Sequence, residues 1–91
     1  MKNITVYPSD LSSEEHVPDR DFVVAVIYPE QKHLEVFIDT YEHDLRELFT
    51  RPLKAYRGPG QTQQLDPWTR EGLEHILFSA LLPLGLYGEF E

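Results

Sequence analysis

Apolar and polar residues alternate along some segments of the chain and recur every three or four residues along others. The segment FVVAVIY (22–28) is apolar at every position and rich in β-branched residues, a pattern typical of a strand buried on both faces within a sheet. HLEVFID (33–39) instead alternates, as a strand with one buried face does. Only four residues separate the two segments, which predicts a hairpin. We expect its core positions to be Val24, Val26, Leu34, Val36 and Ile38.

Three shorter segments are also predicted to be strands. NITVY (3–7) alternates around Ile4 and Val6, and we expect it at an edge of the sheet. LKAYR (53–57) and LYGEFE (86–91) are the other two.

A helical period appears in YEHDLRELFTR (41–51). Thr40 is the expected N-cap of this helix, and Pro52 ends it. Glu42 precedes Arg46 by one turn, the favourable order for an ion pair on a helix. The apolar side chains form one stripe, made of Tyr41, Leu45, Leu48 and Phe49.

A second helix is predicted from Pro67 to Leu82. Asp66 is its expected N-cap, because Asp before Pro is a common helix start with Pro in the first helical position. Pro83 and Gly85 end the helix.

In chain order the predicted elements are β-β-β-α-β-α-β. This order predicts a small single-domain α+β sandwich spanning residues 1–91, with a mostly antiparallel sheet and two helices on one face. The opposite face of the sheet would then be exposed. We expect a homodimer or a protein partner to cover it, because it would carry an apolar patch made of Val23, Ala25, Ile27 and Phe37.

The composition agrees with one folded domain. The 91 residues are 41% apolar and include five Phe, five Tyr and one Trp, whereas disordered chains are poor in such residues. The chain has no cysteine, which excludes disulfides and thiolate metal ligands. The most apolar stretch, residues 76–87, is interrupted by Pro83 and Gly85 and is too short to span a bilayer. We expect a soluble, cytoplasmic protein that does not bind membranes.

Charge is distributed unevenly. The net charge of −8 argues against direct nucleic-acid binding, because phosphates attract basic surfaces. Ten acidic residues lie between positions 8 and 44, and residues 8–21 are predicted to be a mobile acidic loop. Four of the eight basic residues lie between positions 45 and 65, where they either balance neighbouring acids or form a patch for a partner.

The stretch AYRGPGQTQQLDPWT (55–69) contains the candidate binding residues. Its glycines suggest a phosphate cradle, but Pro59 removes one N–H from the loop and Asp66 would repel an anion. We expect residues 58–66 to be an exposed loop that contacts a protein partner. The partner-binding candidates are Tyr56, Arg57, Gln61, Gln63, Gln64 and Trp68. The alternative is a plain connection whose Trp68 packs inward.

Patterns for catalysis and metal binding are weak. Each predicted helix carries a His–Glu pair at i, i+4: His43 with Glu47, and Glu71 with His75. A metal site would require the two pairs to meet, so they are better explained as surface pairs. Ser12 and Ser13 lie beside His16, but a nucleophile needs a rigid setting.

The sequence therefore predicts a protein-interaction or regulatory module with no catalytic activity, no cofactor and no metal. The alternative is an acidic inhibitor or nucleic-acid mimic whose carboxylates occupy the basic groove of a nuclease or other DNA-binding protein.

Overall fold

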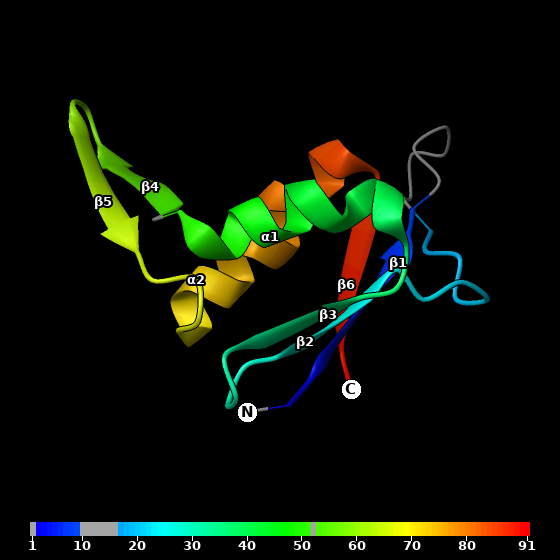
Figure 1. Cartoon of the computed structure of the whole chain (residues 1–91). Helices are drawn as coiled ribbons and strands as arrows, with labels where there is room; N and C mark the ends of the chain where they lie inside the picture. Colours follow the sequence, from blue (N-terminus) through cyan, green and yellow to red (C-terminus); the bar gives the residue numbers. More distant parts are fainter. Residues whose placement is uncertain (1, 10–16, 52) are drawn as a thin grey trace.

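The computed structural model describes residues 2–9, 17–51 and 53–91. In this part of the chain, six strands form two separate sheets (Figure 1). The larger sheet has four strands in the order β3-β2-β1-β6, and every neighbouring pair is antiparallel. Its strands are β1 (Ile4–Pro8), β2 (Ala25–Tyr28), β3 (His33–Val36) and β6 (Leu86–Phe90).

The central hairpin is confirmed, since β2 pairs with β3 and Tyr28 lies opposite His33 next to the turn. The expected edge position of the first strand is wrong, because β1 lies between β2 and β6. The C-terminal strand returns beside β1 and places Phe90 opposite Ile4. The alternation of apolar and polar residues in this segment is the same whether the strand lies at the edge or in the interior of a sheet. Its second neighbour, β6, comes from the other end of the chain and leaves no mark on the local pattern.

The predicted faces are wrong in β2. Ala25 and Ile27, expected on the open face, are fully buried in the core, whereas Val26 is only half-buried. Pairing places Val26 beside Thr5 and Glu35, on the face opposite the core. An uninterrupted apolar run contains no alternation to indicate which face is inward, and a shift of one residue exchanges the faces.

The other predicted core positions agree with the structure. Val24 is fully buried: its N–H donates to the Val6 carbonyl and its carbonyl accepts from the Phe37 N–H, both at 2.8 Å. Leu34 is buried, and the next two inward residues of its strand region, Val36 and Ile38, are partly buried against the core.

Helix α1 (Glu42–Thr50) follows a 3-10 turn (Asp39–Tyr41). The predicted Thr40 cap is wrong, because Thr40 belongs to this turn and α1 begins without a side-chain cap. The predicted apolar stripe is confirmed. Leu45 is fully buried, and the remaining members pack against the core: Tyr41, Leu48 and Phe49.

Helix α2 (Arg70–His75) begins later than the predicted start at Pro67. The Asp66 carboxylate accepts the Trp68 N–H at 2.9 Å, which forms a turn before the helix. The N-cap is Thr69, whose side chain accepts the N–H of the third helical residue at 3.2 Å. Asp-Pro is compatible with both a helix cap and a turn, and here it forms the turn.

The helical path continues beyond α2 through a π-helical segment, η2 (Ile76–Ala80), and a 3-10 segment, η3 (Leu82–Leu84). Gly85 ends this path as predicted, with a left-handed φ of 74°. Along this path Leu77 and Leu81 are buried in the core, and both side chains lie close to Gly88 of β6.

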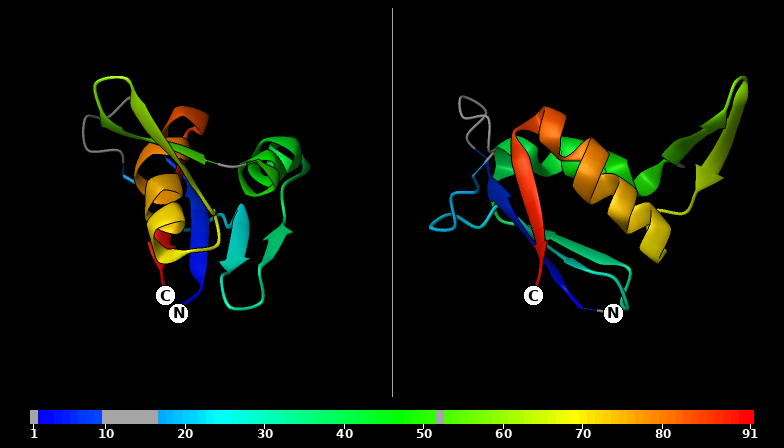
Figure 2. Two further views of the ribbon diagram at one scale, coloured as in Figure 1. Left: turned by 90° about the vertical axis from the view of Figure 1, so that its left-hand side faces the viewer. Right: turned by 180° about the vertical axis from the view of Figure 1, so that it is seen from behind.

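Helix α1 and the path α2–η2–η3 lie over one face of the four-stranded sheet (Figure 2). Gly88 allows η2 to approach β6 closely, since a Cβ at this position would lie 2.2 Å from Leu77 Cδ2. The described residues thus form the predicted small α+β domain. The buried core consists of Ile4, Val6, Val24, Ala25, Ile27, Leu34, Leu45, Leu73, Ile76, Leu77, Leu81 and Leu86.

The predicted acidic loop at 8–21 falls largely outside the described residues, because positions 10–16 are not among them. Its described end is attached to the sheet. The Asp19 N–H donates to the carbonyl at the end of β1 at 2.8 Å, and Arg20 forms an ion pair with Glu89 of β6. Within the described ranges, no helix is long and apolar enough to cross a lipid bilayer.

Candidate functional site

Residues 58–66, predicted to be a loop, contain a strand. β5 (Gln61–Leu65) pairs antiparallel with β4 (Leu53–Gly58), and only Pro59 and Gly60 lie between them. Gly60 has a φ of 72°, which a glycine adopts without strain from a Cβ. The predicted strand before the turn is confirmed, but the nine-residue loop is wrong. Most of β5 is exposed on both faces, so its sequence carries no apolar alternation.

The β4–β5 hairpin projects from the rest of the domain and is attached at one end (Figures 1 and 2). At this root, Leu65 is buried and the ring of Trp68 packs on Phe49 with centroids 4.5 Å apart. Towards the turn most side chains are exposed, and Tyr56 is 73% exposed. Burial of side chains is therefore concentrated at the root of the hairpin.

Strand pairing gives the hairpin two distinct faces. Tyr56 lies opposite Thr62 and Lys54 lies opposite Gln64, so these four side chains share one face, here called the outer face. All four are exposed. The other face carries the buried residue Leu65 and therefore turns towards the domain.

Arg57 links this inner face to the domain. Alternation along β4 places Arg57 on the same face as Leu53 and Ala55, and its Nε donates to Gln63 Oε1 at 2.8 Å. Its Nη2 forms an ion pair with Glu71 of α2. Arg57 is thus held by two contacts within the chain and supports the position of the hairpin.

The structure separates the six predicted binding residues into three groups. Tyr56 and Gln64 lie on the outer face, and Gln61 lies next to the turn. Arg57 and Gln63 are bonded to each other on the inner face. Trp68 lies apart from the other five, in the root, where it packs against Phe49 as in the alternative of a plain connection.

Two outer-face residues, Lys54 and Thr62, are absent from the sequence-based candidates. They complete the surface around Tyr56. Because side chains alternate between the two faces of a strand, Lys54 is expected on the same face as Tyr56 from the sequence alone. Thr62 can be placed on that face only after residues 61–65 are known to form a strand.

The hairpin also presents two free backbone edges. β4 and β5 pair only with each other, and no backbone hydrogen bond links residues 53–65 to another element within the described part of the chain. Edge N–H and C=O groups of this kind are available to pair with a further strand. The hairpin carries Lys54 and Arg57 and no acidic residue, in a chain whose net charge is −8.

The two His–Glu pairs do not meet. His43 Nε2 lies 3.5 Å from Glu47 Oε2, and Glu47 is also paired with Arg51 at 2.7 Å. Glu71 is paired with Arg57 of the hairpin. Among the described residues no three His, Asp or Glu side chains come together as metal ligands. The serine and histidine candidates at positions 12, 13 and 16 lie outside the described residues.

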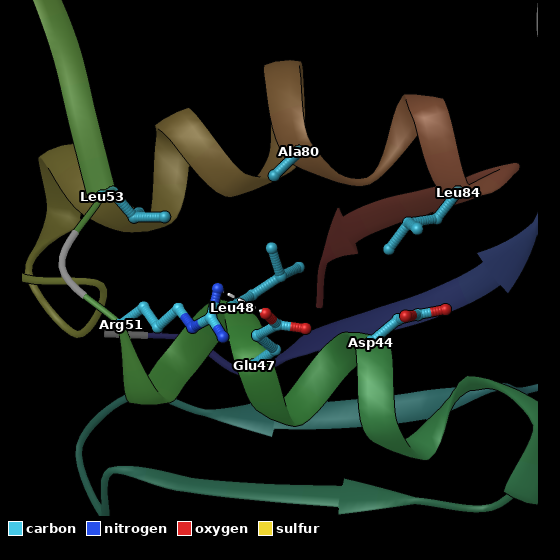
Figure 3. Close-up of a pocket in the computed structure, with 7 residues that line it drawn as sticks. All are labelled: Asp44, Glu47, Leu48, Arg51, Leu53, Ala80 and Leu84. Atoms are coloured by element: carbon cyan, nitrogen blue, oxygen red, sulfur yellow. Dashed lines mark ion pairs between the residues drawn. The ribbon is translucent and has the colours of Figure 1, made fainter.

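A hollow of about 320 Å³ adjoins the root of the hairpin, between α1 and the segments η2 and η3 (Figure 3). Leu48 points into it from α1, and Leu53 reaches it from the start of β4. At its rim Arg51 is already paired with Glu47. The hollow therefore offers mainly apolar walls, and the carboxylates of Asp44 and Glu47 outnumber the one cation at its rim. Its lining consists of Asp44, Glu47, Leu48, Arg51, Leu53, Ala80 and Leu84.

Comparison of the chain with protein families, with curated proteins and with solved structures gave no match.

Proposed function

We propose that the protein is a small binding module without catalytic activity, and that its β4–β5 hairpin binds an extended segment of a partner protein. The observation that carries this proposal is the projecting hairpin itself, with an exposed outer face and two edges that pair with no other strand in the part of the chain that the structure describes. The cysteine-free composition is compatible with a cytoplasmic location, which is part of the same proposal.

The energetics of the hairpin support a role in binding a partner. A two-stranded hairpin is at best marginally stable in water, and ordering its backbone costs about 1–2 kcal/mol per residue. Beyond the root, its side chains bury little surface that would offset this cost. Binding of a further strand would add backbone hydrogen bonds and bury side chains on one face, as in other cases of strand addition.

The charge of the hairpin indicates the chemistry of the partner. The described part of the outer face contains Lys54 and no carboxylate, whereas the remainder of the chain is strongly acidic. We therefore propose that the partner segment is extended and acidic, so that it is attracted to the hairpin and repelled by the rest of the surface. Tyr56 is the aromatic anchor in this arrangement.

A random peptide library displayed on phage tests this proposal. Selection on the wild-type protein should enrich extended peptides that contain Asp and Glu. The combined change Lys54→Ala and Tyr56→Ala should weaken the enriched peptides at least tenfold, about 1.4 kcal/mol, because it removes the anchor and the charge. N-methylation of alternate peptide bonds should abolish binding if the peptide pairs as a strand.

A matched control is Phe78→Ala, since Phe78 is 71% exposed and belongs to η2 rather than to the hairpin. This variant should bind the enriched peptides like wild type. Peptides that bind the hairpin variant and wild type equally would contradict the proposal. Enrichment of basic peptides whose binding weakens with salt would favour the acidic-mimic alternative instead.

A further inference from the structure

A second hollow, of about 290 Å³, lies beside the β2–β3 turn and α1. It shares no residue with the hollow of Figure 3. None of its described lining residues is acidic, although the chain has 16 acidic and only 8 basic residues. The lining consists of Lys32, His33, Leu34, Arg46, Phe49, Thr50 and Trp68.

Lys32 lines this hollow, and its backbone conformation is unusual. Its φ is 51°, and it is the only residue other than glycine with a positive φ in the described ranges. Its N–H donates to the Pro29 carbonyl at 3.2 Å, which closes the turn. Glycine adopts this conformation with less strain than lysine. The side chain has no bonded partner among the described residues, so local structure does not explain the choice of lysine.

Arg46 supplies a second cation from α1. Its Nε pairs with Glu42 at 3.0 Å, and its Nη1 donates to the Leu34 carbonyl at 3.3 Å. These contacts hold the guanidinium against β3. The His33 ring instead stacks on Tyr28, with centroids 5.7 Å apart. Lys32 and Arg46 are the lysine and arginine side chains that line the hollow.

The aromatic side chains Phe49 and Trp68 border the same hollow. Their rings pack on each other, and both residues are only partly buried. An aromatic surface beside two cations is suited to a ligand that contains both a ring and an anionic group, because the ring stacks while the anion accepts charge-assisted hydrogen bonds.

We propose that this hollow binds a small aromatic phosphate. The ring packs against Trp68, and the phosphate contacts Lys32 and Arg46. Ligand pockets begin at about 300 Å³, so the volume fits a small ligand rather than a large cofactor. This proposal does not rest on the function of the β4–β5 hairpin.

The only tryptophan of the chain is Trp68, so its fluorescence reports directly on the hollow. Titration with adenosine 5′-monophosphate or phenyl phosphate should change this fluorescence with saturation. Adenosine alone and inorganic phosphate alone should each bind at least tenfold more weakly, because each lacks one of the two groups. Saturation by adenosine monophosphate but not phenyl phosphate would identify a nucleotide as the ligand, and the reverse would identify a simple aryl phosphate.

Lys32→Gln should weaken binding of the better phosphate about tenfold, since it removes one charge from the hollow. The control Lys54→Gln removes a lysine from the hairpin and should bind like wild type. Lys32→Gly should raise the melting temperature by relieving the backbone and should still lose binding. No saturable fluorescence change with either aromatic phosphate, equal binding of inorganic phosphate, or wild-type affinity in Lys32→Gln would overturn the proposal.

Discussion

The hairpins β2–β3 and β4–β5 are both antiparallel pairs joined by short turns, but they differ in how much of each is buried in the domain. β2 and β3 belong to the four-stranded sheet, and Ala25, Ile27 and Leu34 are buried beneath the helices. β4 and β5 have no third strand in the described structure and bury side chains only near the root. One hairpin therefore holds the domain together, while the other is held by the domain.

The largest difference between the two hairpins should appear when a charge is introduced. Ile27 lies between Ile4 and Leu34 in the sheet and is fully buried. Ile27→Asp should unfold the domain, because a buried unpaired carboxylate costs several kcal/mol, a large fraction of the stability of a small protein. Circular dichroism during thermal melting measures the effect.

The matched change in the other hairpin is Thr62→Asp, at an exposed strand position. It should leave the free energy of unfolding within about 0.5 kcal/mol of wild type. A cooperative, wild-type-like melt of Ile27→Asp would show that the assignment of the core face is wrong. Unfolding of Thr62→Asp would show that the hairpin packs against the domain along its whole length.

The same difference explains which elements the sequence predicts. The β2–β3 hairpin is predicted because burial requires apolar residues, but the continuous run at 22–28 does not show which face is inward. β5 is missed because its exposed positions accept Gln and Thr, which are equally suited to a loop. Arg57 is recognised as a candidate, yet its partner Glu71 follows only from the folded arrangement of the hairpin and α2. The periodicity of apolar residues in a sequence reflects burial, so a site made of exposed residues produces only a weak pattern.

The second prediction concerns self-association through the β2–β3 region. Phe22 is 60% exposed, Phe37 is 52% exposed and Val23 is 39% exposed. We expect a homodimer that covers this patch. The combined change Phe22→Ser and Phe37→Ser should shift the protein to monomer in sedimentation velocity experiments.

Phe78→Ser serves as the control for that change, because Phe78 is also exposed but lies on η2. It should leave the sedimentation coefficient unchanged. A wild-type protein that sediments as a monomer at every concentration would refute the homodimer. In that case the patch would be smaller than a stable interface requires, since Ala25 and Ile27 are in the core and do not contribute to it.

The third prediction tests how the β4–β5 hairpin is held. Arg57→Ala removes both the hydrogen bond to Gln63 and the ion pair with Glu71. Amide hydrogens of residues 54–64 should exchange about three to five times faster, because local opening becomes easier while the core is unaffected. Lys54→Ala, on the outer face, is the control and should leave exchange unchanged. Equal exchange rates in wild type and Arg57→Ala would mean that the root alone holds the hairpin.

The smallest effect should come from a second arginine, which holds the segment leading into β2. Arg20 bonds to Glu89 through Nε at 3.1 Å and through Nη2, and this hydrogen bonding lowers the pKa of the Glu89 carboxyl. A carboxyl whose pKa is lower in the folded state adds stability above its unfolded pKa, about 4.3, and this contribution disappears as the pH falls through the folded pKa. The Arg20 side chain is exposed and that of Glu89 is partly exposed, so the effect is small.

Glu89→Gln should therefore melt slightly below wild type at neutral pH, and the two proteins should converge as the pH falls through the lowered, folded-state pKa of Glu89. Glu71→Gln removes the corresponding pair of the projecting hairpin and should not change the global melting temperature at either pH, because that pair does not join elements of the core. A difference between Glu89→Gln and wild type that persists unchanged in acid would exclude titration of Glu89 as its cause. If Glu71→Gln lowered global stability as much as Glu89→Gln does, the β4–β5 hairpin would contribute to the stability of the whole domain, and the proposed difference between the two hairpins would be wrong.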